Sequence, residues 1–200
     1  ITLKPSLFFD TPLVSIIDET SAIVTADTWC FGSCVLLETV NLPGLIWIGD
    51  YTFSGCYTMN SFTSGSLAAI GSVAFADCAA LPNISLTSET YTTINGGTFM
   101  GCTSLSSSTF SAPYIIQVNS EAFKGCTGFD EINETMFPVL QNIETSVFEN
   151  CTGLGSFGLD SVVYASTRAF KGCTNLYEFY ASGLGSIGEE AFKGCTDLGF

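Results

Sequence analysis

Hydrophobic residues recur along this chain at nearly constant intervals. A phrase of Phe, a variable residue, a turn-forming residue and Cys occurs eight times. Its cysteines are 22, 22, 24, 24, 25, 22 and 22 residues apart, and they are Cys34, Cys56, Cys78, Cys102, Cys126, Cys151, Cys173 and Cys195. Self-similarity at a fixed period of this size indicates a solenoid of stacked coils.

Other apolar positions keep the same register. The third residue after each Cys is large and apolar, as Leu37 is after Cys34. Positions six and eight are often apolar too, as in Val40 and Leu42, although position six is Ser108 in one coil. This period-2 alternation predicts a short strand with those residues facing inward. A second column lies five residues before each Phe: Ile48, Ile70, Ile94, Val118, Ile143, Ala165 and Ile187.

The residue before each Cys predicts a tight turn. It is Gly in five coils, and otherwise Asp77, Asn150 or Ser33. Gly, Asp and Asn tolerate a positive φ better than other residues. We therefore expect a left-handed turn that closes a short helical segment, such as "EEAF" at 189–192, with Ser33 as the exception.

One coil of this length cannot bury its own apolar side chains, whereas stacked coils bury them in a continuous core. We predict a single repeat solenoid over residues 1–200, with about eight or nine coils of 22–25 residues, each made of a short β-strand and a short helical turn. Residues 1–12 form an N-terminal strand and a degenerate first coil, and residues 13–200 form the regular coils. In the degenerate coil, the Phe, Cys, third and sixth positions are expected to be Leu7, Asp10, Leu13 and Ile16.

The phrases "IGEEAFKGCTDL" and "IGSVAFADCAAL" resemble the repeats of the BspA-like (Treponema pallidum-type) leucine-rich repeat family, and the resemblance covers roughly residues 13–200. It implies a curved leucine-rich solenoid, extracellular or on a microbial or protist cell surface, and often a role in adhesion. The chain has few Lys residues, and most coils lack the Pro that often follows the strand in this family, Pro43 being the clearest case. A fold of this kind says little about the ligand.

Eight of the nine cysteines hold one equivalent position per coil. A buried thiol packs like a small hydrophobe, so this column indicates a structural ladder of reduced thiols. Neighbouring positions lie near the separation that a disulfide permits, so bridges remain an alternative. Cys30 is the ninth and stands where four coils have Ala. A linear row with no His and no C-x-x-C pair predicts no metal site.

Charge and composition narrow the function. The net charge is -14, with 5 Lys and Arg residues and no His. Nucleic acid binding needs clustered cations, so we predict no nucleic acid partner. No apolar stretch is long enough to span a bilayer, so we predict no membrane insertion. Without His, the commonest general base, and without a phosphate-binding motif, we predict no enzyme activity, no catalytic residues and no cofactor.

Charged residues near the turns are expected on the solvated surface. Two adjacent carboxylate pairs have no cleft predicted around them: Asp130–Glu131 and Glu189–Glu190. One coil position forms a basic row with a Glu inserted, in which ion pairing is expected to be weak: Lys124, Glu149, Lys171 and Lys193.

Positions five and seven after each Cys should point outward from the strand. They are polar and rich in hydroxyl groups: Thr39/Asn41, Ser61/Thr63, Asn83/Ser85, Ser107/Thr109, Glu131/Asn133, Ser156/Gly158 and Glu178/Tyr180. Protein-binding hot spots favour Trp, Tyr and Arg, so this face is a poor candidate for tight protein binding, and ice or crystal-surface binding is a minor alternative. Three N-x-S/T sequons make Asn83, Asn133 and Asn150 candidate glycan carriers, Asn150 being the weakest because it lies at the turn.

The start of the sequence has the pattern of the strand that would follow its last residue. If the two ends were joined, the first and third residues would fall six and eight positions after Cys195. The interpretations are a window from a longer array, chance, or head-to-tail polymerisation into a filament by strand addition. The candidate junction residues are Ile1, Leu3, Pro5, Leu198 and Phe200.

These features predict a non-enzymatic extracellular protein with a structural or adhesive role, with self-assembly into filaments as one route to it. The alternative is the ectodomain of a surface receptor or adhesin. The expected partners are another copy of the chain, or a host or cell-surface protein or glycan. Trp29, Trp47 and Tyr57 in the first coils are the aromatic residues that favour the alternative.

Overall fold

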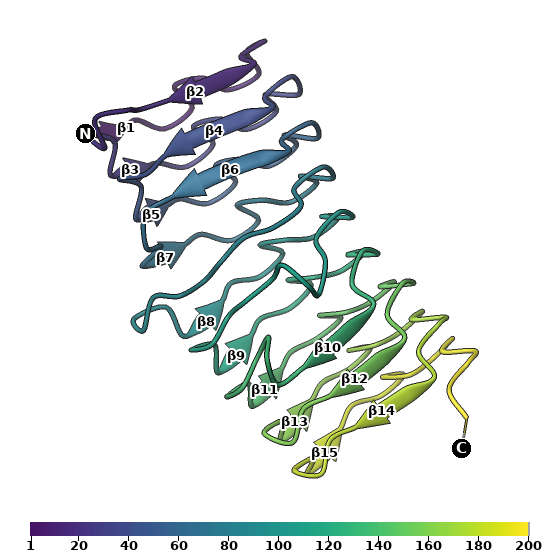
Figure 1. Ribbon diagram of the computed structural model, residues 1–200. Helices are drawn as coiled ribbons and strands as arrows, with labels where there is room; N and C mark the ends of the chain where they lie inside the picture. Colours follow the sequence, from purple (N-terminus) through teal and green to yellow (C-terminus); the bar gives the residue numbers. More distant parts are fainter. Residues whose placement is uncertain (200) are drawn as a thin grey trace.

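The computed structural model describes residues 1–199, which form a parallel β-solenoid whose coils stack in sequence order (Figure 1). Two rows of short strands run along it. The main row contains β2 (Ser15–Ile17), β4 (Thr39–Leu42), β6 (Ser61–Ser64), β10 (Glu131–Asn133), β12 (Ser156–Gly158) and β14 (Glu178–Tyr180). The second row contains β1 (Thr2–Leu3), β3 (Thr25–Ala26), β5 (Trp47–Ile48), β7 (Ala69–Ile70), β8 (Thr93–Ile94), β9 (Gln117–Val118), β11 (Asn142–Ile143), β13 (Tyr164–Ala165) and β15 (Ser186–Ile187). The predicted leucine-rich solenoid is confirmed.

The main row is interrupted in the middle of the solenoid. Its sheets are β2-β4-β6 and β10-β12-β14. In the coils between these two sheets, an isolated bridge between Ser85 and Ser111 is the only β-pairing that continues the main row within residues 1–199. Ser85 is seven residues after Cys78, whereas Ser111 is nine residues after Cys102. Because the bridge places these two residues opposite each other, the coil after Cys102 carries two extra residues before its inward positions. Phe110 therefore points inward at position six, where Ser108 was expected, and its ring meets Phe123 edge-on at 5.4 Å.

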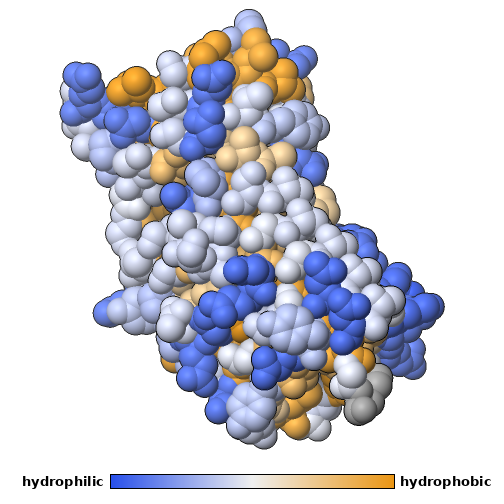
Figure 2. Space-filling view, turned by 45° about the vertical axis from the view of Figure 1, so that its right-hand side comes forward, coloured by the Kyte–Doolittle hydropathy of each residue, from blue (hydrophilic) through white to orange (hydrophobic). Residues whose placement is uncertain are grey.

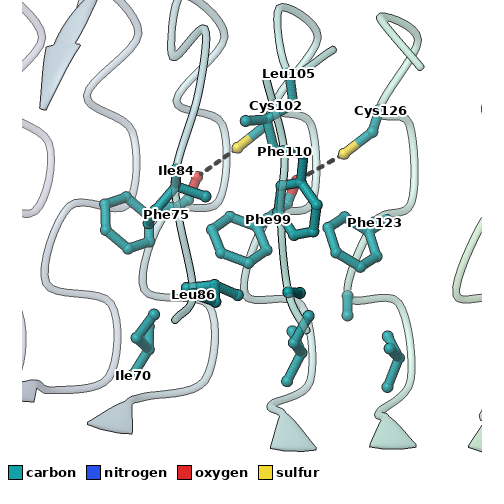
Figure 3. Packing of buried hydrophobic residues seen from close by; sticks show 14 of the residues in the cluster. Ile70, Phe75, Ile84, Leu86, Phe99, Cys102, Leu105, Phe110, Phe123 and Cys126 are labelled. Carbon is teal, nitrogen blue, oxygen red and sulfur yellow. Dashed lines mark hydrogen bonds between the residues drawn. The ribbon is translucent and has the colours of Figure 1, made fainter. Parts of the chain in front are cut away.

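The core is a set of columns, one residue per coil. The Phe rings are nearly parallel, as in Phe31–Phe53 at 5.1 Å and 4° and Phe123–Phe148 at 5.6 Å and 3°. Offset stacking of this kind adds about 0.5–1.5 kcal/mol per aromatic pair beyond burial. Figure 3 shows Phe75, Phe99 and Phe123 of this column, with Cys102 and Cys126 on one side of it and Ile70 on the other.

Eight of the nine cysteines, all except Cys30, form a column of free thiols beside the Phe rings. Each thiol of this column donates a hydrogen bond to the Phe carbonyl of the preceding coil, as Cys126 Sγ does to Phe99 O at 3.0 Å (Figure 3). Burial raises the pKa of Cys151 to about 12, so its thiol stays protonated and able to donate this bond. The column is buried from Cys34 to Cys173, and Cys195 is partly exposed.

The segment before each Cys is not helical; we call it the turn edge. Residues 1–199 contain no helix, so the expected helical turns are wrong. The cause is the hydrogen bonding of alternate N–H groups. The N–H groups of Gly32 and Cys34 bond three residues back, whereas those of Phe31 and Ser33 bond to the next coil at 2.8 and 2.7 Å. An α-helix would need all four N–H groups for its own i→i−4 ladder.

The left-handed turn before each Cys is present in every coil, including Ser33 with φ 59°. The structure adds a second left-handed row, five residues before each Cys, which composition did not reveal. Its members are Trp29, Tyr51, Val73, Gly97, Glu121, Ser146, Arg168 and Glu190. Side chains other than Gly, Asn and Asp pay about 1–2 kcal/mol in this conformation, which the coil-to-coil hydrogen bonds must offset.

The degenerate first coil has a register that differs by one residue from the expected one. Phe8, not Leu7, stacks on Phe31 at 5.3 Å, and its carbonyl accepts the Cys34 thiol. Thr11, not Asp10, holds the Cys position, with its Oγ1 3.5 Å from Cys34 Sγ. The expected positions of Leu13 and Ile16 agree with the structure: Leu13 packs against the core, and Ile16 pairs with Val40. The chain is one residue shorter between Thr11 and Leu13 than in later coils.

The register assigned to the first residues is also wrong. β1 pairs with β3 of its own chain, with Leu3 opposite Ala26, so Leu3 belongs to the second-row column rather than to the main row. Leu3 is buried, whereas Ile1 is 70% exposed and Pro5 is exposed. Leu198 packs against the core, and Phe200 lies outside the described residues. The strand match on which the head-to-tail junction rested therefore does not hold.

A further column lies eleven residues before each Cys, and one of its members is polar: Ile23, Leu45, Leu67, Tyr91, Ile115, Leu140, Val162 and Leu184. Tyr91 is 5% exposed, and its hydroxyl has no hydrogen-bond partner among residues 1–199. Burial raises the pKa of Tyr91.

We expect Tyr91→Phe to stabilise the protein by about 1 kcal/mol, because it removes a buried hydroxyl that has lost its water without gaining a partner. Chemical denaturation of the two proteins measures the difference. The matched control is Tyr57→Phe, which removes an exposed hydroxyl and should change little. A clear loss of stability for Tyr91→Phe would contradict this account.

The left-handed turns allow a second test at Gly125, where φ is 74° and a Cβ would have no contact closer than 3.9 Å. Gly125→Ala should cost about 1–2 kcal/mol from backbone conformation alone, because nothing obstructs the added carbon. Gly125→Asn should cost less, since Asn tolerates this region and Asn150 occupies the equivalent turn. Equal losses in thermal unfolding would show that φ is not the cause.

Candidate functional site

The outward face of the main row divides into two chemically different halves. Over β2, β4 and β6 the outward residues are neutral, such as Thr39, Asn41 and Thr63. Over β10, β12 and β14 they include Glu131 and Glu178. Figure 2 shows strongly hydrophilic residues gathered toward the C-terminal end of the face in view. The two halves are separated by the interruption between β6 and β10 (Figure 1).

Two adjoining grooves hollow the C-terminal half. The larger has a volume of 530 Å³, and its lining is Asp130, Glu131, Gly153, Gly155, Ser156, Asn175, Tyr177 and Asp197. The smaller has a volume of 240 Å³, and its lining is Ile132, Asn133, Ser156, Phe157, Gly158, Glu178 and Tyr180. Ser156 lines both. We define the acidic face as Asp130, Glu131, Tyr177, Glu178, Tyr180 and Asp197.

Glycines shape the floor of these grooves. A Cβ on Gly155 would come within 2.8 Å of Tyr177 Cε1, so the missing side chain gives the Tyr177 ring its place. A Cβ on Gly158 would have no heavy atom within 4 Å, so the face is open at that point. Tyr177 is 64% exposed and Tyr180 57%, and both rings are therefore available to a partner.

Ser107 holds the acidic residues from the preceding coil. Its Oγ accepts hydrogen bonds from the N–H groups of Asp130 and Glu131, at 3.2 and 3.1 Å, and donates to the Glu131 carbonyl. The Ser107 hydroxyl lowers the pKa of Asp130, which keeps that carboxylate ionised. The Glu131 carboxylate accepts a hydrogen bond from Asn133 Nδ2 at 2.7 Å. Sequence reasoning placed Ser107 on the outward strand, whereas it braces the start of the next one.

The cations are paired elsewhere, along the turn edge. Lys124 lies 2.9 Å from Glu121 and 3.6 Å from Glu149, which also contacts Lys171 at 3.3 Å. Glu149 thus interrupts the basic row as its position in the sequence indicated.

A second cluster joins Glu190 to Lys193 and Arg168, each at 2.7 Å, and these two cations lower the pKa of Glu190 to about 2. None of the ion pairs found in residues 1–199 involves the acidic face. The carboxylates of that face are therefore not neutralised by cations of the described residues. In the Glu189–Glu190 pair, by contrast, Glu190 is neutralised by Arg168 and Lys193.

The three sequons differ in their surroundings. Asn83 is exposed and lines a separate 380 Å³ groove with Thr63 and Ser85. Asn133 is engaged, because its Oδ1 accepts hydrogen bonds from Thr135 and its Nδ2 donates to Glu131. Asn150 has φ 62° in the left-handed turn. Asn83 and Asn150 are both exposed, and of these two only Asn83 lies outside a left-handed turn.

The aromatic residues of the first coils do not gather into one patch. Trp29 stacks on Tyr51 at 4.4 Å on the turn edge, whereas Trp47 lies on β5. Tyr57 makes no ring contact with either in the described part of the chain. Sequence reasoning instead missed Tyr177 and Asp197. Tyr177 lies four residues after Cys173, and Asp197 lies two residues after Cys195. A comparison of the residues at these two positions in all coils would have identified them as candidates.

Within residues 1–199, no three His, Cys, Asp or Glu residues lie close enough together to hold a metal ion. No helix that is long and apolar enough to cross a membrane occurs in that same range.

Solved structures share this fold. A leucine-rich repeat protein of T. pallidum aligns with a TM-score of 0.58 and 21% identity, over 93% of this chain and 78% of that one. A leucine-rich cell surface protein of Faecalibacterium prausnitzii aligns with a TM-score of 0.58 and 18% identity, over 94% and 70% of the two chains. A leucine-rich repeat protein of Bacteroides ovatus gives 0.54 and 18%, over 99% and 69%. At these identities the likeness shows the fold alone.

Family membership rests on the repeats themselves. No curated protein matches the sequence. The family described as "BspA type Leucine rich repeat region", with 6 copies of its repeat, matches residues 24–133 and 92–199. These two matches overlap and together span most of the solenoid, including the Phe and Cys columns. The chain therefore belongs to the BspA-type leucine-rich repeat family.

Proposed function

We propose that this protein is a non-enzymatic recognition module at the cell surface, which binds a protein or glycan partner through the outward face of its main row. The single observation that carries the proposal is the pair of adjoining grooves on β10, β12 and β14, with two exposed Tyr rings at their margins. Tyr is among the residues that contribute most at binding hot spots.

The scaffold supports binding because it holds these side chains in place. Each residue of β12 is paired on both sides, with β10 and with β14, so the backbone under the grooves is fixed before a partner arrives. Pre-organisation lowers the conformational entropy lost on association. A rigid row of outward residues is therefore suited to recognition.

Chemistry at this face is a weaker explanation. Catalytic acids usually have a pKa shifted toward their working pH by burial or like charge. Hydrogen bonding instead lowers the pKa of Asp130, which favours a permanently ionised carboxylate. Burial raises the pKa of the Cys126 and Cys151 thiols, which lie in the core column and donate hydrogen bonds to Phe carbonyls.

The surface location draws on the family and on one neighbour, which is named a cell surface protein. Adhesion is the role that fits a surface solenoid with a binding face, and a glycan on Asn83 is compatible with it because that side chain is exposed. Filament formation is not part of the proposal, because β1 pairs with β3 of its own chain.

The proposal predicts both exposure at the surface and binding by the groove face. Antibody should label intact cells of the source organism, and purified protein should bind at least one member of an array of matrix proteins and glycans. Changing both rings, Tyr177→Ser with Tyr180→Ser, should weaken that binding about 30-fold, which is the effect of losing a hot spot.

The control is Tyr57→Ser, which removes a Tyr ring of similar exposure away from the grooves and should leave binding unchanged. Labelling that requires permeabilised cells would rule out the surface location. Binding that survives the double change would rule out the groove face.

A further inference from the structure

The geometry points to a cationic peptide segment, rich in Lys or Arg and extended along the solenoid, as the ligand of the acidic face. This inference rests on the proposed function and names the chemistry of its partner.

Charge complementarity is the first argument. Asp130, Glu131, Glu178 and Asp197 line the two grooves, and no ion pair within residues 1–199 reaches any of them. The nearby coils do carry cations, but these pair with Glu121, Glu149 and Glu190 on the turn edge. A cationic partner would neutralise carboxylates that the protein leaves open, and an anionic partner would be repelled.

The direction of the larger groove is the second argument. Its lining repeats the same two coil positions on successive coils: Gly153, Asn175 and Asp197 at position two, with Asp130, Gly155 and Tyr177 at position four. The lining therefore comes from four successive coils, three of them at each position, and the groove runs along the solenoid axis. Coils about 4.8 Å apart and an extended peptide rising about 3.3 Å per residue give room for roughly three residues.

The Tyr rings are the third argument. Tyr177 lines the larger groove and Tyr180 the smaller one, with Ser156 between the grooves. Lys and Arg side chains are attracted to the faces of exposed aromatic rings as well as to carboxylates. A cationic side chain entering from solvent would meet both kinds of group on this face.

A glycan is the competing ligand, because aromatic rings and carboxylates also bind sugar hydroxyls. However, binding of a neutral glycan would not explain why this face has four carboxylates that form no ion pair within residues 1–199. Since the whole chain carries a charge of -14, weak attraction of any cationic peptide is also expected, and the experiment must separate local from general attraction.

Substitutions at Gly158 can separate local attraction at the acidic face from general attraction to an acidic protein. Its Cβ direction is open, it pairs with Asn133 and Tyr180, and it lines the smaller groove. Gly158→Lys puts a cation in the middle of the acidic face, and Gly158→Glu adds a side chain of similar length and opposite charge. Asn41→Lys places a Lys at the equivalent position of β4, on the neutral half. It changes the net charge by as much as Gly158→Lys does.

The probe is a labelled short peptide of alternating Lys and Gly, compared with peptides of alternating Glu and Gly and of alternating Ser and Gly. Fluorescence anisotropy is measured at about 50 and about 300 mM sodium chloride, where screening differs strongly. We expect binding of the Lys peptide alone. It should weaken about tenfold or more with Gly158→Lys, be equal or tighter with Gly158→Glu, and be nearly unchanged with Asn41→Lys. Thermal unfolding confirms that each variant is folded.

Equal weakening by Gly158→Lys and Asn41→Lys would overturn the inference, because it would show general attraction to an acidic protein. Failure to bind the Lys peptide, together with binding of a neutral oligosaccharide that is lost with the Tyr177→Ser and Tyr180→Ser changes, would overturn it and leave the proposed function standing. If neither the peptide, nor an oligosaccharide, nor any array partner binds, both fail.

Discussion

Backbone hydrogen bonds between neighbouring coils are the constraint on which the rest of the structure depends. They join coils along both strand rows, and along the turn edge they use every second N–H group, as in Phe123 N–H to Val147 O at 3.0 Å. Equivalent residues of successive coils are thereby held one above another. Phe must then stack on Phe, and each Cys thiol lies beside the Phe carbonyl of the coil before it.

The same constraint governs charge. Residues at one coil position are brought close together, so like charges in successive coils would repel. On the turn edge, Glu149 lies between Lys124 and Lys171 and contacts both, and Lys193 in the next coil pairs with Glu190. The main row uses spacing instead, because uncharged Ser156 separates Glu131 from Glu178. Its carboxylates are therefore kept apart without being neutralised, and their charge remains available to a partner.

The irregular coil after Cys102 helps to build the acidic face. Its two extra residues move Phe110 into the inward position and release Ser107 from the strand. Ser107 can then bond to the backbone of Asp130 and Glu131 at the start of β10. An interruption in one part of the main row thus supports the site in the next part.

The sequence by itself determined the repeat, the inward columns and the left-handed turn before each Cys, because these depend on residue type at a fixed position in every coil. It could not show that the turn edge is not helical, since the competing bonds come from a different coil. It also misplaced Phe110 and Phe8, where a coil gains or loses residues, and it assigned Leu3 to the wrong strand row. Only the pairing between coils reveals these registers. Only the tertiary structure decided that Asp130, Tyr177 and Asp197 line one groove, because residues from three separate coils meet there through stacking.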